Sequence, residues 1–181
     1  MNEESPLTVW KKQVANIPNC KVLCTGTKIW PGSINPVHSK HLPEATWKGT
    51  DIEGGEGVDI VADLHNIHEI VGRDSFDAIF SPATLEHVQR PWVALRSMAQ
   101  VLRPGGGLFI QTHQTFPLHG YPHDYFRFSV EALITLCSDA GLRTIGYAYE
   151  NPCTITPPSE VTVWNHVAES YLNVCITAVK P

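Results

Sequence analysis

The chain has 181 residues, of which 43% are hydrophobic and 17% are charged, and its formal net charge is −5. This length and composition exclude a disordered or fibrous chain and predict one domain over residues 1–181. The acidic balance argues against a general affinity for nucleic acid. No apolar run is long enough to span a bilayer, so we expect no membrane partner.

The start of the chain, MNEESPLTVW, is acidic and lacks the basic start and apolar stretch of a signal peptide. The five cysteines are odd in number and include no C-x-x-C pair, which argues against disulfides and against a cysteine zinc site. Two of them, Cys137 and Cys175, lie in apolar periodic segments and are expected in the core. We therefore expect a cytoplasmic protein.

Seven short apolar segments are predicted to form β-strands. They are residues 21–25, 46–52, 58–62, 76–81, 108–112, 144–149 and 171–179. Near-continuous apolar strands that alternate with helices predict an α/β fold, with a mostly parallel sheet that is covered on both faces.

Two helices are well marked in the sequence. The first begins at Pro91, because proline is tolerated at the first helical position, and it ends before Pro104. The second follows Ser129, a favourable N-cap, and ends near Gly141. Both carry apolar residues at helical spacing, which predicts that each covers the sheet with one buried face.

Two segments are predicted to be irregular. Residues 28–45 hold several prolines and leave room for no more than a short helix from Pro36, capped by Asn35. Helix content before the second strand is therefore expected to be reduced. Residues 151–170 are rich in proline and threonine and are expected on the surface between the last two strands.

The carboxyl ends of the predicted strands are the expected place for a ligand, because parallel α/β sheets bind ligands there. The second and third strands end at Asp51 and Asp63, and Gly26 follows the first. A carboxylate at the second strand can accept two hydroxyl hydrogen bonds from a ribose, and one at the third can accept from an exocyclic amine. Each aspartate alone could equally cap a turn, but together with Gly26 they favour a bound nucleoside.

Three stretches resemble the class I S-adenosylmethionine-dependent methyltransferases, in particular the type 11-like group. They are GTDIEGGEGVDIVADLHNI, FDAIFSPATLEHVQRPWVALRSMAQVLRPGGGLFI and FPLHGYPHDYFRFSVEALITLCSDAGL. The resemblance covers roughly residues 47–142 and implies a Rossmann-like, seven-stranded, mostly parallel sheet with a reversed last strand. It also implies S-adenosylmethionine as cofactor.

The resemblance implies roles for particular residues. Asp51 would hold the cofactor ribose, Asp63 and Leu64 would meet the adenine, and Ser81 would face the methionine end, with Glu86 and His87 nearby. The full set of predicted cofactor-binding residues is Thr25, Gly26, Thr27, Asp51, Ile52, Asp63, Leu64, Ser81 and His87.

The sequence departs from the family pattern in two places. The first loop, CTGTKIWPG, has Cys24 where an acid is common and keeps only Gly26 of three expected glycines, and Lys28 adds a positive charge near the expected sulfonium. Only residues 53–57 separate the second strand from the third, so either the third strand is very short or the chain crosses there in an extended form.

The stretch HGYPHDYFRF, residues 119–128, combines groups that can move a proton with four aromatic rings. It follows the fifth strand, near the expected methyl-donor end, so His119, His123 and Asp124 are the candidate catalytic residues and the rings would exclude water. A metal site on the same three residues competes, but the glycine and proline between the histidines argue against it, and no metal is predicted. In a purely structural alternative, His123 and Asp124 tie down the loop and Arg127 pairs with an acid.

The resemblance and the strand-end acids predict a methyltransferase that transfers a methyl group to the oxygen or nitrogen of a small molecule. The alternative is a degenerate protein of the same fold that binds or scaffolds without chemistry, which the eroded glycine loop favours. The acceptor pocket is expected from residues 28–45, 113–128 and 151–170, or from a second subunit in a homodimer.

Overall fold

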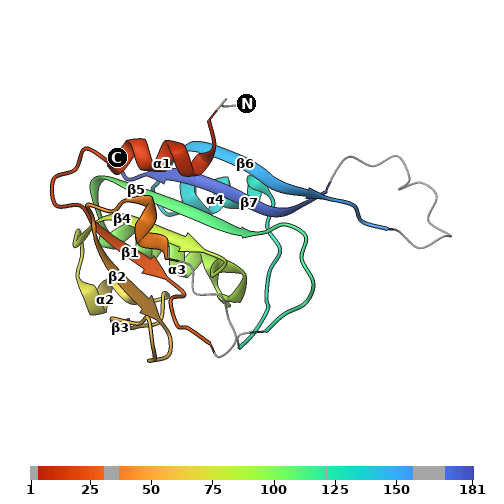
Figure 1. The fold of residues 1–181 in the computed structure, drawn as a ribbon, viewed down its shortest axis with the longest axis horizontal. Coiled ribbons are helices and arrows are strands. Elements are labelled where there is room, and N and C mark those ends of the chain that lie inside the picture. Colours follow the sequence, from red (N-terminus) through yellow and green to blue (C-terminus); the bar gives the residue numbers. More distant parts are fainter. Residues whose placement is uncertain (1–3, 31–36, 121, 157–169) are drawn as a thin grey trace.

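A computed structural model of the protein describes residues 4–30, 37–120, 122–156 and 170–181. Its centre is a seven-stranded sheet with the strand order β3-β2-β1-β4-β5-β7-β6 (Figure 1). The strands are β1 Lys21–Thr25, β2 Thr46–Asp51, β3 Ile60–Val61, β4 Phe76–Pro82, β5 Leu102–His113, β6 Arg143–Cys153 and β7 Ser170–Val179. Strands β1 to β5 pair in parallel, and β7 runs antiparallel to both β5 and β6. The predicted Rossmann-like sheet is confirmed.

Helices cover both faces of the sheet. They are α1 Pro6–Val14, α2 Ile67–Val71, α3 Pro91–Val101 and α4 Val130–Asp139, with short 3-10 helices at His38–His41 and Leu85–His87. Helix α3 packs against α2 and α4 on one face, whereas α1 lies across β5, β6 and β7 on the other (Figure 1). Helices α3 and α4 begin where the sequence predicts, with Pro91 in the first turn of α3 and the Ser129 side chain accepting the Ala132 N–H at the start of α4.

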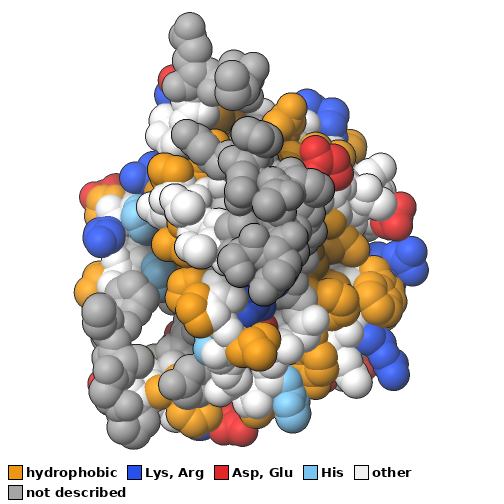
Figure 2. All heavy atoms as spheres, turned by 90° about the vertical axis from the view of Figure 1, so that its right-hand side faces the viewer, with side chains coloured by type: hydrophobic (Ala, Val, Ile, Leu, Met, Phe, Trp, Pro, Cys, Tyr) orange, Lys and Arg blue, Asp and Glu red, His pale blue; other side chains and the backbone are white. Residues whose placement is uncertain are grey.

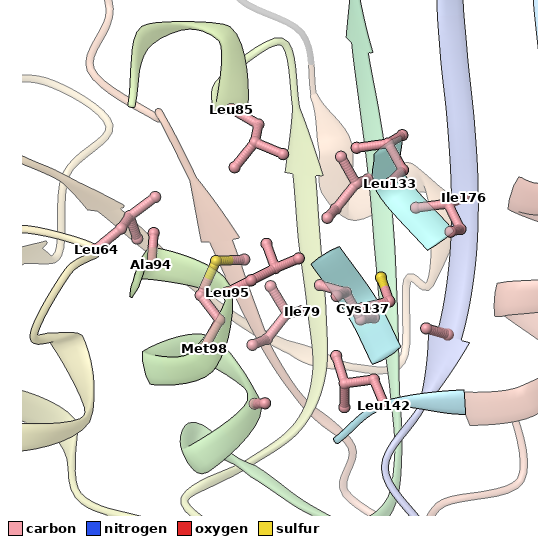
Figure 3. Packing of buried hydrophobic residues seen from close by; sticks show 14 of the residues in the cluster. Leu64, Ile79, Leu85, Ala94, Leu95, Met98, Leu133, Cys137, Leu142 and Ile176 are labelled. Atoms are coloured by element: carbon pink, nitrogen blue, oxygen red, sulfur yellow. The ribbon is translucent and has the colours of Figure 1, made fainter. Parts of the chain in front are cut away.

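The strands bury side chains on both faces, and this divides the core in two. On the α3 and α4 side, alternate strand residues such as Ile79 and Ile176 pack against Leu95 and Leu133, as Figure 3 shows, and Leu23 belongs to the same cluster. Their neighbours along the strands face the other side and form a second cluster: Val22, Cys24, Ala78, Phe80, Phe109 and Cys175. The expected burial of Cys137 and Cys175 is confirmed.

Helix α1 was not predicted, and it covers the face on which the described residues between β1 and β2 form only a short 3-10 helix. Its Ser5 side chain caps the first turn, and Pro6 begins the helix. The fully buried Trp10 donates its ring N–H to the Gly107 carbonyl over 3.0 Å and packs on Phe80 at 5.4 Å. Beside it, the rings of the 3-10 helix His38–His41 also lie on Phe80. The expected reduction in helix content before β2 is confirmed for the described residues, while the predicted Asn35 cap lies outside them.

Strands β3 and β5 differ most from the prediction, and β6 runs to Cys153, beyond its predicted end at Tyr149. Strand β3 has two residues in place of the five predicted over residues 58–62, so the first of the two alternatives for the short β2–β3 connection is confirmed. Residues 52–59 do not cross in an extended form but contain bends and a turn. Strand β5 starts at Leu102, immediately after α3, and not at Leu108. The proline and glycines between these residues form an irregularity in its pairing with β4 and do not form a separate turn.

None of the helices in the described part of the chain is long and apolar enough to cross a membrane.

Candidate functional site

A cavity of about 360 Å³ opens at the carboxyl ends of β1 to β4. Figure 2 shows the side of the molecule toward which these strands run, where histidine side chains lie among hydrophobic ones. The cavity is lined by Gly26, Lys28, Trp30, Thr50, Asp51, Ile52, Ala62, Asp63, Leu64, His65, Ala83, Thr84, His87, Val88, Gln89, Pro122, His123 and Tyr125. This is the edge on which parallel sheets bind ligands, and its volume lies in the range of small-molecule sites.

Asp51 is fixed at the end of β2 by backbone groups. Its Oδ2 accepts the Lys28 N–H over 3.1 Å, and its Oδ1 accepts the Glu53 N–H over 3.3 Å. Each carboxylate oxygen can accept a second hydrogen bond. The side chain is therefore held in one orientation while it keeps acceptor capacity for a diol in the cavity.

Asp63 lies in a tight turn after β3, next to a histidine that the sequence reasoning did not single out. Its Oδ1 accepts the His65 N–H over 2.9 Å and also lies 2.5 Å from His65 Nδ1. His65 Nε2 accepts the Arg90 N–H over 3.2 Å, so the ring proton must be on Nδ1 and is donated to Asp63. This arrangement leaves Oδ2 of Asp63 available to an exocyclic amine.

Gly26 allows the loop after β1 to approach the loop after β4. Its φ is +64°, and a Cβ atom there would lie 2.5 Å from Thr84 Oγ1. The Thr84 hydroxyl donates to the Pro82 carbonyl over 2.8 Å, and the Thr25 hydroxyl donates to Ser81 Oγ over 2.8 Å. The single remaining glycine of the first loop thus occupies the position where a side chain cannot be accommodated.

Lys28 lines the cavity, and its charge is paired. Its Nζ lies 2.5 Å from Glu53 Oε2 and 4.0 Å from the centre of the Trp30 ring. The expected repulsion of a sulfonium is therefore reduced, because a carboxylate neutralises the amine and an aromatic face holds it.

Only some of the predicted cofactor-binding residues line the cavity. Six of the nine line the cavity: Gly26, Asp51, Ile52, Asp63, Leu64 and His87. The other three do not: Thr25 and Ser81 are buried beneath it, and the Thr27 hydroxyl turns to the Thr50 carbonyl at 3.4 Å. Thr84 and His65 line the cavity and were missed, although the strand-end rule marks the residues after β4 and β3 as candidates.

The loop after β5 brings only one of the three predicted catalytic residues to the cavity. Asp124 forms a two-pronged ion pair with Arg127, with contacts of 2.5 and 2.7 Å, and it accepts the His119 N–H over 3.0 Å. The paired guanidinium holds the pKa of Asp124 well below its usual range. Asp124 therefore orders the loop, as in the structural alternative, and is a poor proton acceptor. Of the three, only His123 lines the cavity. Tyr121 lies outside the described residues.

Beyond His87 lies a buried group that sequence reasoning noted only in passing. Glu86 is completely buried; its Oε2 accepts the Thr112 hydroxyl over 2.7 Å, and its Oε1 lies 3.0 Å from His113 Nε2. Burial opposes ionisation of Glu86, but the adjacent His113 ring, a backbone hydrogen bond and the Thr112 hydroxyl outweigh it and hold the pKa of Glu86 below its ordinary value. Burial likewise lowers the pKa of His113, but the adjacent carboxylate outweighs it and raises that pKa.

Comparisons with known proteins agree with this geometry. A family model described as a methyltransferase domain matches residues 21–110. The ubiquinone biosynthesis O-methyltransferase of Parvibaculum lavamentivorans is 34% identical over 101 residues, which cover 45% of this chain and 40% of that protein. The matched segment thus spans less than half of that relative.

Solved structures share the fold over nearly the whole chain. An S-adenosylmethionine-dependent methyltransferase from Mesorhizobium loti matches with a TM-score of 0.66 and 14% identity, covering 99% of both chains. The 1,6-didemethyltoxoflavin-N1-methyltransferase of Burkholderia thailandensis, solved with S-adenosylhomocysteine, matches with a TM-score of 0.65 and 14% identity, covering 97% of this chain and 76% of its own.

The family model covers β1 to β5, and the strand order and the acids at the ends of β2 and β3 agree with it. The family model, the sheet and the shared fold together support a class I S-adenosylmethionine-dependent methyltransferase, with S-adenosylmethionine as its cofactor.

Proposed function

We propose that this protein transfers a methyl group from S-adenosylmethionine to an oxygen or nitrogen of a small molecule. The observation that carries the proposal is the single cavity that joins Asp51 and Asp63 to His87 and His123. The two carboxylates can accept hydrogen bonds from a nucleoside, and the two imidazoles would face the molecule that receives the methyl group.

The residues present fit the cofactor. Asp51 would accept the ribose hydroxyls, and Oδ2 of Asp63 would accept from the adenine amine, with Leu64 packed against the ring. Gly26 and Thr84, which close the cavity between β1 and β4, would lie beside the methionine part. When bound, the cofactor supplies an electrophilic methyl carbon on a sulfonium, and the protein supplies orientation.

His123 is the proposed proton acceptor. It lines the cavity, and its backbone carbonyl lies 2.6 Å from His87 Nδ1, which fixes its segment against the loop after β4. His123 would accept the proton that the oxygen or nitrogen of the acceptor molecule loses on methylation. Tyr125, on the same wall, would exclude water from the reacting atoms. His119 and Asp124 would hold the loop and take no part in proton transfer.

The choice of a small acceptor is supported by relatives. The Parvibaculum protein is named for O-methylation in ubiquinone biosynthesis, and the Burkholderia structure holds 1,6-didemethyltoxoflavin. The cavity volume of about 360 Å³ also suits small molecules better than a polymer. We propose that residues 1–181 act as one domain, and that a homodimer is one way to complete the acceptor side.

Calorimetric titration with S-adenosylmethionine and S-adenosylhomocysteine tests the proposal. Both should bind with one site per chain. Asp51→Asn should raise the dissociation constant tenfold to a hundredfold, because hydrogen bonds to a charged group contribute about 1.5–3 kcal/mol.

The matched control is Asp139→Asn, which makes the same change at an exposed position at the end of α4 and should leave binding unaltered. No heat with either ligand at millimolar concentration would contradict the proposal and favour the non-catalytic alternative. Binding without methyl transfer to any of a panel of phenols, catechols and amines would favour that alternative as well.

A further inference from the structure

Three side chains next to the cavity form a cluster of metal-ligand type that the proposed methyl transfer does not use. Glu86 comes from the 3-10 helix Leu85–His87, His113 is the last residue of β5, and His119 lies in the loop that follows. One ligand atom from each lies within 4.8 Å of the other two. This set differs from the His119, His123 and Asp124 set considered from sequence.

The hydrogen bonds of the histidines leave the nitrogens of the cluster free to bind a metal. Nδ1 of His119 lies 3.1 Å from the Pro117 carbonyl, and Nδ1 of His113 lies 3.1 Å from Oδ1 of Asn173. A carbonyl oxygen only accepts, so in each neutral ring the proton is on Nδ1 and the lone pair is on Nε2. Metal-binding histidines generally donate their other N–H to a carbonyl or carboxylate in this way.

His87 has the same arrangement and extends the cluster toward the cavity. Its Nδ1 faces the His123 carbonyl at 2.6 Å, and its Nε2 lies 4.0 Å from Oε1 of Glu86. Its ring meets that of His119 edge to face at 4.8 Å. A third imidazole with its Nε2 toward Glu86 is therefore available as a further ligand or as a neighbour of a bound water.

Glu86 provides an independent sign that something is bound here. Its side chain has no exposed surface, yet Oε1 has no hydrogen-bond partner of acceptable geometry among the described residues. The nearby His113 Nε2, at 3.0 Å, forms a close charge contact only. A buried carboxylate oxygen without a hydrogen bond is costly, and a cation between Oε1 and the imidazole nitrogens removes that cost.

We propose that Glu86, His113 and His119 bind a divalent transition-metal ion, with Zn²⁺ as the best match. Two imidazoles and one carboxylate with an open position form a ligand set used by catalytic zinc and by non-haem iron. Magnesium and calcium prefer oxygen ligands throughout and fit the cluster poorly. The atoms of the cluster must draw closer around the ion, and the loop that carries His119 can supply this movement.

The position of the ion suggests a role that rests on the proposed function. The cluster adjoins the His87 wall of the cavity. The open coordination position would take a hydroxyl of the acceptor and lower its pKa before methylation. Metal binding itself does not depend on this role.

Metal binding to the full chain without cofactor tests the site separately from methyl transfer. The protein is stripped with chelator and titrated with Zn²⁺ by calorimetry and with Co²⁺ by visible absorption, with Fe²⁺ and Mg²⁺ as comparison ions. We expect one Zn²⁺ per chain, a Co²⁺ spectrum of low coordination number, and little binding of Mg²⁺.

Glu86→Gln and His119→Ala should each raise the dissociation constant for Zn²⁺ at least tenfold. His41→Ala removes a histidine of the 3-10 helix His38–His41, whose ring lies on Phe80, and should leave this dissociation constant unchanged. Thermal unfolding checks each variant, and His119→Ala is expected to fold because its side chain is partly exposed. No stoichiometric Zn²⁺ in the wild-type protein, or equal binding by His119→Ala, would overturn the proposal.

Discussion

The two halves of the cavity edge are built in different ways. In the acidic half, formed by Asp51 and Asp63 at the ends of β2 and β3, each carboxylate accepts a backbone N–H from two residues further along the chain, and Asp51 also accepts the more distant Lys28 N–H. The histidine half, formed by Glu86, His87, His113, His119 and His123, is held by contacts between distant parts of the chain. The acidic half can therefore be recognised in local sequence, whereas the histidine half exists only once the sheet has assembled.

The contacts of the histidine half show this dependence. His113 meets Asn173 across the β5–β7 pair, 60 positions away, and His87 meets the His123 carbonyl across 36 positions. The Tyr125 N–H donates to the Glu86 carbonyl over 2.8 Å. Changes in the histidine half should therefore alter the order of the loop, while changes in the acidic half should alter ligand affinity alone.

The largest effect is expected at Gly26, where the two halves meet. Gly26→Ala places a Cβ atom 2.5 Å from Thr84 Oγ1 at a φ of +64°. We expect a loss of about 3 kcal/mol in the free energy of unfolding, from backbone strain together with the steric clash. Denaturant unfolding measures it.

A second substitution separates the two causes of the lost stability in Gly26→Ala, which are backbone strain and the steric clash. Thr84→Ala removes the clashing hydroxyl, so the double variant should recover part of the loss but keep the strain. Equal stability of Gly26→Ala and the wild-type protein would show that the loop after β1 does not approach the loop after β4.

Asp124→Asn is expected to have the next largest effect, confined to the histidine half. It removes one side of the two-pronged ion pair and turns an amide toward Arg127, which should lower the free energy of loop opening by about 2 kcal/mol. Hydrogen exchange at the His119 and Tyr125 amides measures this opening. Unchanged protection of both amides, or an equal change in Asp139→Asn, would contradict the assignment of Asp124 to loop order.

The Glu86–His113 contact predicts a pH dependence of stability, measured in the presence of a chelator. The pKa of Glu86 is lowered in the folded protein. Its contribution to stability is therefore complete above the unfolded-state pKa near 4.5 and is lost as the pH falls through the folded-state pKa. The pKa of His113 is raised in the folded protein. Its contribution to stability is therefore complete below the unfolded-state pKa of 6.5 and is lost as the pH rises through the folded-state pKa.

The destabilisation caused by His113→Asn should therefore be greatest between pH 4.5 and pH 6.5 and smaller at pH 9. We expect about 2 kcal/mol at the maximum, because the change leaves the buried Glu86 carboxylate without its charged neighbour. A destabilisation that does not vary between pH 5.5 and pH 9 would show that the two side chains do not share a charge.

Lys28→Gln should have the smallest effect and tests the acidic half. Its ion pair with the half-exposed Glu53 contributes about 0.5 kcal/mol at most, as exposed pairs do. Because the charge is already neutralised, we expect less than a threefold change in the dissociation constant for S-adenosylmethionine, measured by calorimetry. A tenfold gain in affinity would mean that the amine faces the sulfonium.

Much of the fold could be predicted because its strands are apolar and its two larger crossover helices carry clear start signals. Helix α1 was missed although Ser5 and Pro6 give such a signal. Strand β3 was predicted too long, because Val58 and Asp59 look like strand residues but belong to the loop, where Asp59 accepts the Gly49 N–H. No local pattern distinguishes Val58 and Asp59 from strand residues.

The site was predictable only where strand ends determine it. Asp51, Asp63 and Gly26 lie where the rule for parallel sheets places them, and the cavity reaches all three. Pairing of Asp124 with Arg127 was foreseen only as an alternative, since two charges three positions apart can meet or diverge in a loop. The group of Glu86, His113 and His119 could not be foreseen, because its members meet only through the pairing of β4 with β5 and the fold of the loop that follows.

A crystal structure of the complex with S-adenosylhomocysteine tests the central claim most directly. We predict ligand density across the cavity, with the ribose hydroxyls on Asp51, the adenine amine at Asp63 and the sulfur on the side of Thr84 and His87. Density elsewhere, or an empty cavity at a saturating ligand concentration, would contradict the account.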